Sequence, residues 1–396
     1  MTPVKTLVFN NGPLLLGRAW GAAEVGQRVA AIFEGVGGVP DDVNTPVLVK
    51  VDAAAGLPGP GGMTTDLRLV GAVLAWLQSR GFRRVQVGDS LPITRRGPAP
   101  SLLRRVRLDR LARHYGYHVV DLTSPTDQVA LILPRGKVRV AAAAFGGYVI
   151  QLPTVAVHPL YGLTGATSGL AGLVHPDDRS LVEADPVPAL LALEAALGRV
   201  LSLPDLLMVR EGSHPPDDLH PLALGLVLGG RDPLVVDLVV ARLLGMTPEE
   251  IPVLWKAVSS GRIPASVLSF VEDRISVFVD VEKPLRPPFD KPSPTFRWPW
   301  PRPKPPPLAS EDTLGGLKRL ASRCGDCHRC EGFCPTGLTR DQIGASPQVS
   351  ACVECLYCWQ VCPHDALELG GDPGPLAGWL TQQRKILPSL TVVEPS

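Results

Sequence analysis

Apolar residues in the first two thirds of the chain alternate between short unbroken runs and stretches with helical spacing. Residues 46–51 (PVLVKV) form a continuous run without alternation, which is typical of a strand covered on both faces. Residues 66–80 then repeat apolar side chains at helical spacing and predict a helix, with Thr64 or Thr65 as its N-cap and Gly81 after its end. The same patterns predict strands at residues 84–87, 119–122, 129–133, 138–142, 206–210 and 225–229, and helices at residues 101–114, 189–201, 234–244 and 248–259.

Strands that alternate with helices in this way indicate an α/β domain, whose mostly parallel sheet carries helices on both faces. We assign residues 1–282 to this domain. Residues 283–310 are predicted to be a linker, because a proline at every second or third position prevents helices and sheet ladders and favours an extended path. Residues 311–372 are predicted to be a small α+β domain, and residues 373–396 a C-terminal tail.

Composition and charge exclude several classes of protein. Of the 396 residues, 45% are apolar and 19% are charged, so the chain buries a core and is not a disordered protein. The 39 basic and 38 acidic residues give a net charge of +1, which provides no field for nucleic acid or an anionic membrane. The first residues lack a secretion signal and no apolar run reaches 18 residues. We therefore predict a cytoplasmic protein with no nucleic-acid partner and no membrane insertion.

All eight cysteines of the chain lie between Cys324 and Cys362. A disulfide framework would spread its cysteines through a small secreted domain, which is not the case here. The cysteines instead repeat one pattern twice, with spacings of three, three and four residues and a proline after the fourth. The two copies are Cys324, Cys327, Cys330 and Cys334-Pro335, and Cys352, Cys355, Cys358 and Cys362-Pro363.

This repeated pattern is typical of two iron–sulfur clusters. Three cysteines at spacings of three converge on one cubane, and the fourth cysteine, before proline, binds the other cluster. The sequence therefore predicts two [4Fe-4S] clusters, one held by Cys324, Cys327, Cys330 and Cys362 and the other by Cys352, Cys355, Cys358 and Cys334. Structural zinc is the alternative, but zinc knuckles need two cysteines each and leave the third cysteine and the Cys-Pro unexplained. His328 and His364 are expected to be bystanders, because all ligand positions are filled.

Residues 319–370 closely resemble the bacterial two-cluster ferredoxin domain, down to the segment Cys362-Pro-x-x-Ala366. The 17 residues between Cys334 and Cys352 are compatible with that fold. The resemblance implies single-electron transfer and a redox partner protein.

Three further segments resemble the family called Domain of Unknown Function 362. They are GGRDPLVVDLVVARLLG, the strand–loop–helix that starts at LVKVDAAAG, and the strand end VQVGDS. The segment LPTVAVHPLYGLTGATSGLAGLVHPDDR also fits the family's central motif, with His158 and the pair Thr164-Gly165 retained. The resemblance covers most of residues 40–260. Because a ferredoxin module is often fused to the same end in that family, it implies an iron–sulfur, redox-linked protein.

The chain departs from the pattern of that family at three places. A lysine usually stands two residues before the motif histidine, and a Lys-Asn pair follows the Thr-Gly; here these places hold Ala156 and Ser168-Gly169. The strand end usually reads Lys-Pro-Asn, whereas this chain has Lys50-Val51-Asp52. A changed substrate and a lost activity are both compatible with these differences.

Polar residues at the ends of the predicted strands form a candidate site. Lys50 and Asp52 follow a central strand, where open α/β sheets bind ligands, and Asp89-Ser90 follow the next strand and either share that crevice or cap a turn. His158 is either a ligand or acid–base group or a core histidine. We predict that Lys50, Asp52, Asp89 and His158 line one crevice, with Lys50, Asp89 and His158 as candidate catalytic residues.

The glycine-rich loop at residues 56–62 precedes a helix N-terminus that is suited to anion binding. It matches neither a P-loop nor a dinucleotide fingerprint, and ordinary turn chemistry is the alternative explanation. Asp232, before Pro233, is predicted to be an N-cap. A helix face of arginines without aromatic residues is expected to be solvated or to face a partner rather than to bind nucleic acid; its members are Arg104, Arg105, Arg107, Arg110 and Arg113.

Three functions remain open at this point. The first is a ferredoxin-coupled oxidoreductase that acts on a small-molecule substrate at the strand ends. The second is a non-catalytic electron carrier or docking subunit for a redox partner, and the third is a cofactor- or metal-handling accessory protein. The sequence has no flavin or nicotinamide fingerprint, so it gives no support for hydride chemistry in the chain itself.

Overall fold

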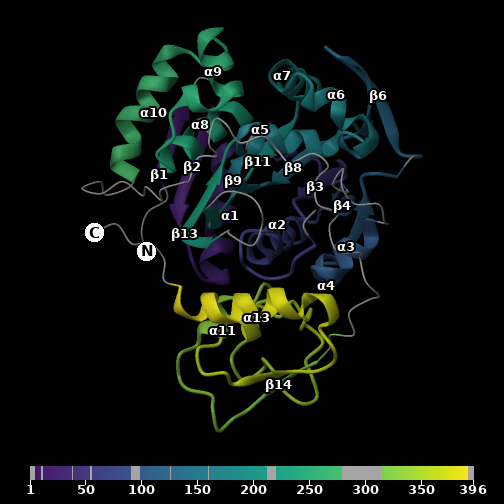
Figure 1. The fold of residues 1–396 in the computed structure, drawn as a ribbon, viewed down its shortest axis with the longest axis vertical. Helices are drawn as coiled ribbons and strands as arrows, with labels where there is room; N and C mark the ends of the chain where they lie inside the picture. Colours follow the sequence, from purple (N-terminus) through teal and green to yellow (C-terminus); the bar gives the residue numbers. More distant parts are fainter. Residues whose placement is uncertain are drawn as a thin grey trace.

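Figure 1 shows the computed structural model of the chain, with the α/β domain above and the cysteine-containing residues below. The structure describes residues 5–9, 12–37, 39–53, 56–90, 99–124, 126–158, 160–211, 220–278, 314 and 316–390. The predicted proline-rich linker at residues 283–310 lies outside the described residues.

A five-stranded sheet, called the parallel sheet below, forms the centre of the domain. Its strand order is β11 (Val200–Ser202), β8 (Tyr148–Leu152), β3 (Val47–Val51), β4 (Val85–Asp89) and β5 (His118–Asp121), and every neighbouring pair is parallel. This is the parallel sheet that the alternation of strands and helices predicts. The carboxyl ends of β3 and β4 therefore meet at one edge of the sheet.

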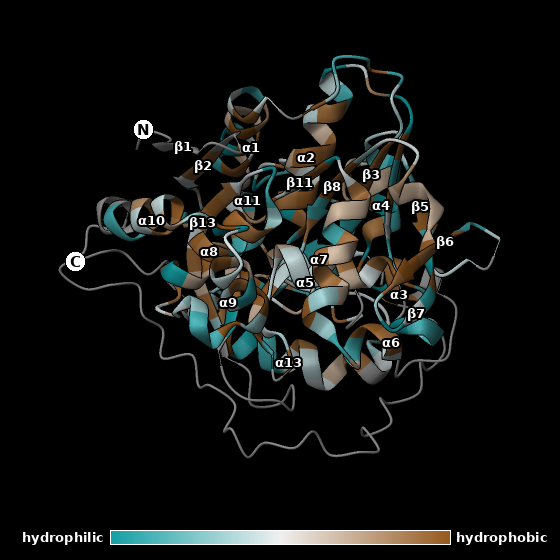
Figure 2. Ribbon diagram, turned by 90° about the horizontal axis from the view of Figure 1, so that it is seen from above, coloured by the Kyte–Doolittle hydropathy of each residue, from teal (hydrophilic) through white to brown (hydrophobic). Residues whose placement is uncertain are grey.

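Helices cover both faces of the parallel sheet, which explains the unbroken apolar run of β3. Val47, Val49 and Val51 pack in one core with α1 (Ala22–Val36), α2 (Leu67–Ser79) and α4 (Leu108–His114). Leu48 points to the opposite core, with α5 (Ala166–Gly169), α7 (Pro186–Leu197), α8 (Pro233–Leu243) and α9 (Pro252–Ser259). Figure 2 shows the apolar strands between these two helical layers.

The domain also contains a second, six-stranded sheet, called the mixed sheet below, which the sequence pattern did not predict. Its order is β1 (Lys5–Phe9), β2 (Gly12–Arg18), β13 (His220–Gly229), β12 (Asp205–Glu211), β9 (Thr154–His158) and β10 (Gly162–Thr164). Only β12 and β9 run parallel; the other pairs are antiparallel. Because β8 continues into β9 after one residue, the mixed sheet extends from the carboxyl edge of the parallel sheet.

Several local predictions need correction. The predicted helix at residues 101–114 is two helices, α3 (Ala99–Arg105) and α4, because the backbone of Arg107 is left-handed with φ of 64°. The predicted strands at residues 129–133 and 138–142 form a separate antiparallel hairpin, β6 (Gln128–Leu133) and β7 (Gly136–Ala141).

The remaining elements of the domain are the helix α10 (Ala265–Phe278), the short helix α6 (Arg179–Glu183) and the 3₁₀ turns η1 (Ala142–Ala144), η2 (Leu170–Leu173), η3 (Pro176–Asp178) and η5 (Pro248–Glu250).

Capping residues behave partly as predicted. Asp232 is the N-cap of α8, as expected, and accepts hydrogen bonds from the backbone N–H groups of Leu234 at 3.0 Å and Val235 at 3.3 Å. The N-cap of α2 is Asp66 rather than Thr64 or Thr65, and its carboxylate accepts from Arg68 N at 2.8 Å.

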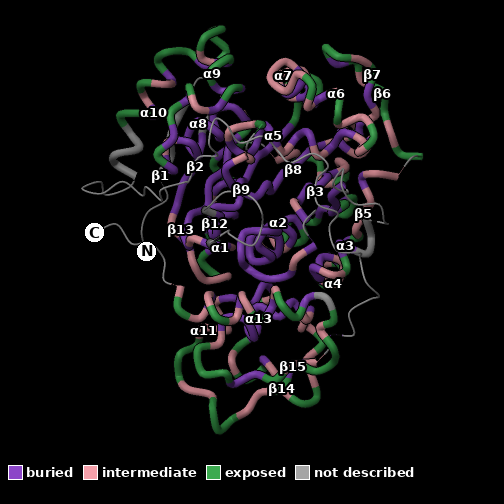
Figure 3. The backbone as a smooth tube through the Cα atoms, viewed as in Figure 1, coloured by how far each residue is buried: buried purple, intermediate pink, exposed green. Residues whose placement is uncertain are grey.

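The cysteine module, defined here as residues 316–372, packs beneath the α/β domain (Figure 1). It contains the antiparallel pair β14 (Leu317–Arg319) and β15 (Leu367–Leu369), and the short helices α11 (Arg329–Gly332) and α12 (Tyr357–Val361). The predicted tail is also structured: η6 (Gly374–Leu376), α13 (Ala377–Ile386) and η7 (Leu387–Ser389) follow the module. Figure 3 shows the module's lower loops exposed and its upper side buried where it meets α2. Within the described residues, no helix is long and apolar enough to cross a membrane.

Candidate metal centre and strand-end site

Four cysteines of the module surround one cavity. The thiols of this outer thiol set, Cys324, Cys327, Cys330 and Cys362, line a cavity that opens to the surface. Cys327 is exposed and the other three are half-buried. His328 and His364 line the same cavity.

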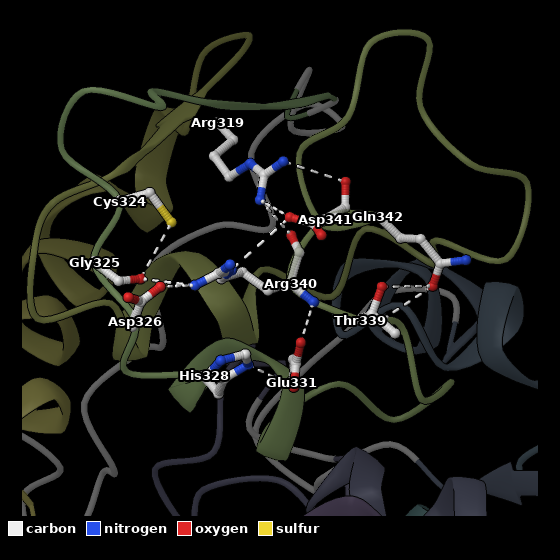
Figure 4. A network of polar contacts seen from close by, with 10 residues as sticks. All are labelled: Arg319, Cys324, Gly325, Asp326, His328, Glu331, Thr339, Arg340, Asp341 and Gln342. Atoms are coloured by element: carbon white, nitrogen blue, oxygen red, sulfur yellow. Dashed lines mark hydrogen bonds and ion pairs between the residues drawn. The ribbon is translucent and has the colours of Figure 1, made fainter.

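Charged side chains hold the loops around this cavity together (Figure 4). Arg340 donates to the carboxylate of Asp326 and to the carbonyl of Gly325, next to Cys324, and its backbone N–H donates to Glu331. Glu331 also lies 3.1 Å from His328 Nδ1. The segment that carries the first three cysteines is thus fixed to the loop at residues 339–342.

The other four cysteines form a second, deeper group, the inner thiol set. Cys334, Cys355 and Cys358 are buried, and Cys352 is half-buried. Burial, together with the thiols of Cys334 and Cys352, raises the pKa of Cys355 well above its usual range. Burial also raises the pKa of Cys358, and the thiols of Cys355, Cys334 and Cys352 add to this shift, as does Cys330 of the outer set. The four thiols are therefore close enough to interact electrostatically.

The outer thiol set has the donors that an iron–sulfur cluster needs. Among the described residues, no three His, Cys, Asp or Glu side chains lie close enough together to hold one metal ion. The four thiols of the outer set nevertheless share one cavity. Four thiols around one cavity are the donors that a [4Fe-4S] cluster uses.

The inner thiol set lies against the α/β domain. Cys355 and Tyr357 belong to the same apolar core as α1, α2 and the parallel sheet. Tyr357 Oη accepts a hydrogen bond of 3.0 Å from the backbone N–H of Leu67, in the first turn of α2. A Cβ on Gly71 would lie 2.7 Å from the carbonyl oxygen of Pro335, so only glycine allows this approach of the module to α2.

A cluster of charged residues is buried where α2 begins. Arg68 pairs with Asp66 at 2.7 Å, and both side chains are at most 1% exposed. The guanidinium of Arg68 also lies 4.1 Å from the ring centroid of Phe333 in the module. Asp205, at the start of β12, accepts from Asp66 N at 2.7 Å and from Leu207 N at 3.2 Å. Burial raises the pKa of Asp205 to about 7. Sequence reasoning missed these roles of Asp66, Arg68 and Asp205; an arginine in the first turn of an otherwise apolar helix was the available signal.

Three of the predicted strand-end residues lie together. Lys50 Nζ is 3.5 Å from Asp89 Oδ1, and both side chains are buried. Asp89 also accepts from Ala53 N at 2.7 Å, while Asp52 accepts from the Thr154 hydroxyl at 2.6 Å. Burial raises the pKa of Asp89; the charge of Lys50 opposes this shift and that of Asp52 adds to it.

His158 is part of the turn after β9. Its Nδ1 accepts from the backbone N–H groups of Leu160 and Tyr161, both at 3.2 Å, and its ring stacks on Tyr161 with centroids 4.6 Å apart. Arg179 lies between this turn and the strand ends: it donates to Ser90 Oγ and to the Gly172 carbonyl. Burial lowers the pKa of Arg179, while the charges of Asp89 and Tyr161 act in the opposite direction. Arg179 was not singled out from the sequence.

The glycine loop is an interface and not an open anion site. A Cβ on Gly59 would lie 2.2 Å from Gln360 Oε1, and one on Gly61 would lie 2.4 Å from Gln383 Oε1. Trp379 Nε1 donates to the Pro58 carbonyl at 2.8 Å. The N–H groups of residues 66–68 donate to Asp205, Tyr357 and Asp66. The interpretation of this helix N-terminus as an anion site is therefore wrong, because its first donors already have partners within the protein.

Two arginines of the predicted basic face contact this chain's own module. Arg107 donates to the carbonyls of Glu354 and Leu314, and Arg110 pairs with the Glu354 carboxylate. The expected partner-facing surface thus meets residues of the same chain.

The central motif of the domain ties several elements together. Asp237 of α8 accepts from the backbone N–H groups of Ala166 at 2.6 Å and Thr167 at 2.7 Å. A Cβ on Gly165 would lie 2.3 Å from Asp237 Oδ1. Thr164 Oγ1 accepts from Ala156 N at 2.7 Å. The Thr164-Gly165 pair therefore has a structural role in joining β9, β10, α5 and α8.

Comparison with known families agrees with this geometry. Residues 47–242 match the family model described as Domain of unknown function (DUF362), and residues 348–368 match that of the 4Fe-4S binding domain. The chain contains a DUF362 domain and a 4Fe-4S binding motif. The second match spans Cys352, Cys355, Cys358 and Cys362, and it supports an iron–sulfur electron-transfer role.

One solved structure and the curated proteins complete the comparison. A crystal structure of a Thermotoga maritima protein is similar at 13% identity and a TM-score of 0.35. The similarity covers 54% of this chain and 56% of the Thermotoga chain. A search of curated proteins finds no match.

Proposed function

We propose that this DUF362-containing chain binds two [4Fe-4S] clusters and is an oxidoreductase. In this proposal a redox partner protein exchanges electrons at the outer thiol set, and a small-molecule substrate reacts at the strand ends of the domain. The observation that carries the proposal is the difference between the two thiol sets: Cys327 of the outer set is exposed, whereas Cys355 of the inner set is buried against the α/β domain. When bound, clusters of this type accept and release single electrons.

The proposed ligands follow the crossed arrangement of the cysteine pattern. Cys362 comes from the second half of the pattern but shares its cavity with Cys324, Cys327 and Cys330, which supports its place in the outer set. Cys334 comes from the first half, and its thiol acts on Cys355 and Cys358, which supports its place in the inner set.

A short segment of the domain contacts both the module and the strand ends. The Leu67 N–H donates to Tyr357, which lies between two cysteines of the inner set. Two residues earlier, Thr65 Oγ1 accepts from Asp52 N at 2.8 Å and donates to the Leu152 carbonyl at 2.6 Å. Residues 65–67 thus form a short link: Leu67 contacts the module beside the inner thiol set, and Thr65 contacts the carboxyl end of β3.

The strand-end group has the chemistry to bind and protonate a substrate that receives electrons. Lys50 supplies a buried cation, and Asp89 is a buried carboxyl whose pKa is raised, so it holds a proton more readily than an exposed aspartate. His158 takes part in the turn after β9 through Nδ1, and an imidazole at this strand end has the chemistry for acid–base work. We therefore keep Lys50, Asp89 and His158 as the proposed catalytic residues.

The cluster proposal is tested by metal content and by serine variants. Anaerobically purified protein is expected to hold about eight iron and eight sulfide per chain, from two four-iron clusters. Cys334→Ser and Cys355→Ser are expected to alter the same electron paramagnetic resonance signal, and Cys327→Ser the other. Two zinc ions without sulfide would refute the proposal, and a signal shared by Cys334→Ser and Cys327→Ser would refute the crossed ligation.

The oxidoreductase proposal needs a separate experiment. Protein reduced with dithionite and then freed from it is mixed anaerobically with pools of small carbonyl, carboxylate and amide compounds, and recovery of the visible absorbance is followed. At least one class is expected to reoxidise the wild type and Lys256→Met, which changes an exposed lysine, but not Lys50→Met with its clusters intact. Reoxidation by an acceptor protein such as cytochrome c alone would show a non-catalytic electron carrier instead.

A further inference from the structure

Asp66, Arg68 and Asp205, the buried ionic trio, contain two acids and one base. All three residues are at most 1% exposed. Arg68 donates to both carboxylate oxygens of Asp66, at 2.7 Å from Nη2 and 3.1 Å from Nε. The oxygens of Asp205 accept from the backbone N–H groups of Asp66 and Leu207. With both acids ionised the trio carries a net charge of −1 inside the protein, which is costly in a medium of low polarity.

The trio lies on the face of the domain that the inner thiol set covers. Asp66 immediately precedes Leu67, whose N–H donates to Tyr357 Oη. Phe333, next to Cys334, stacks against Arg68. The charge of Asp66 acts on both Cys355 and Tyr357. A charge that appears at the inner thiol set therefore acts on the trio, since Asp66, Tyr357 and Cys355 are buried and charges in a buried medium are screened weakly.

We propose that Asp205 takes up one proton when one electron reaches the inner thiol set, so that electron and proton transfer are coupled. This inference rests on the proposed function, because it needs a cluster bound by the inner set. The electron comes from a one-electron donor, the redox partner protein or dithionite, and the proton comes from water. An O–H bond forms on the Asp205 carboxylate, and it breaks again when the electron leaves.

Asp205 is the member of the trio that is suited to this exchange. Asp66 accepts two hydrogen bonds from one guanidinium, whereas Asp205 accepts from neutral N–H groups. Burial raises the pKa of Asp205 to about 7, the charge of Asp66 adds to the shift, and Arg68 opposes it. Tyr357 and Cys355 face Asp66 from the module. Burial keeps Tyr357 neutral by raising its pKa, whereas Cys355 would be a thiolate ligand of the bound cluster.

The sign of the coupling sets the pH range in which it is visible. Reduction adds negative charge and raises the pKa of Asp205 above its value in the oxidised protein. Below about pH 7 the carboxyl is protonated in both states, so the potential of the inner centre is constant. Above that pH, reduction brings a proton with it, and the potential falls by up to about 59 mV for each tenfold drop in proton concentration.

The experiment is a spectroelectrochemical titration of the cluster-loaded full chain from pH 6 to 9. The wild type is expected to show the slope for its inner centre, and Asp205→Asn a potential that does not change with pH. Asp127→Asn, which changes an exposed acid, is expected to keep the slope of the wild type. The outer centre lies beside His328 and His364, and its own pH profile is expected to be the same in all three proteins.

A second measurement does not depend on a variant that folds. Wild-type protein is photoreduced in weak buffer at pH 8 with an indicator dye, and we expect proton uptake at the inner centre of up to one proton per electron. A wild-type potential that is constant over the whole range, or an Asp205→Asn protein that keeps the slope, would overturn the inference. Protein without clusters would instead refute the proposed function, so the two failures are distinguishable.

Discussion

Replacing Arg68 by methionine removes the guanidinium that pairs with Asp66 and keeps an apolar stem of similar length. Asp66 is then left at 1% exposure as an unpaired carboxylate. Removing one partner of a buried ion pair costs about 3–5 kcal/mol, which lowers the thermal unfolding midpoint of the domain by roughly 5–15 °C. The loss is expected also to weaken the attachment of the module, because Arg68 stacks on Phe333. Thermal unfolding of the cluster-loaded protein, followed by tryptophan fluorescence, measures the shift.

An exposed ion pair of the same residue type provides the control. Arg80 and Glu34 are 51% and 59% exposed, and Arg80→Met is expected to cost at most about 1 kcal/mol. The double variant Asp66→Asn with Arg68→Met is expected to be more stable than Arg68→Met alone, because the carboxylate that lost its guanidinium is also removed. The reasoning is refuted if Arg68→Met costs no more than Arg80→Met, or if the double variant is as unstable as the single one.

Two further predictions concern the interface and the central motif. Gly71→Ala places a methyl group 2.7 Å from the Pro335 carbonyl and is expected to expose the module to limited proteolysis, whereas Gly26→Ala, in open space on α1, is expected to leave the cleavage pattern unchanged. Burial raises the pKa of Asp237 to about 6, so the folded state binds a proton that the unfolded chain has already lost at that pH. The free energy of unfolding of the wild type, relative to Asp237→Asn, is therefore expected to fall by about 2 kcal/mol from pH 4 to pH 6, and a difference that is constant over this range in urea titrations would contradict it.

The strand-end site was partly predictable because parallel strands end at one edge. Lys50 and Asp89 belong to neighbouring strands that the sequence pattern identifies, and the structure pairs them at 3.5 Å. Arg179 comes from a helix about ninety residues after Asp89, and its link to Ser90 depends on how η2 and α6 fold over the strand ends. A sequence pattern gives no information on such a distant contact.

The glycine loop shows where local chemistry misleads. Glycines before a helix N-terminus are suited to anions, and nothing near Gly59 or Gly61 in the sequence indicates another use. The structure places Gln360 and Gln383, about 300 residues later, against these two positions. The glycines are required by close packing between the domain and the module.

The sequence by itself determined the features that depend on short spacing. The cysteine repeat indicated iron–sulfur chemistry, the run at β3 indicated a strand covered on both faces, and Asp232 was identified as an N-cap, because each depends on residues a few positions apart. Only the tertiary structure decided the pairing of the mixed sheet, the burial of Asp66, Arg68 and Asp205, and the placement of the inner thiol set against α2. These features arise from contacts between segments far apart in the chain, where packing and burial, rather than local propensity, determine which groups meet.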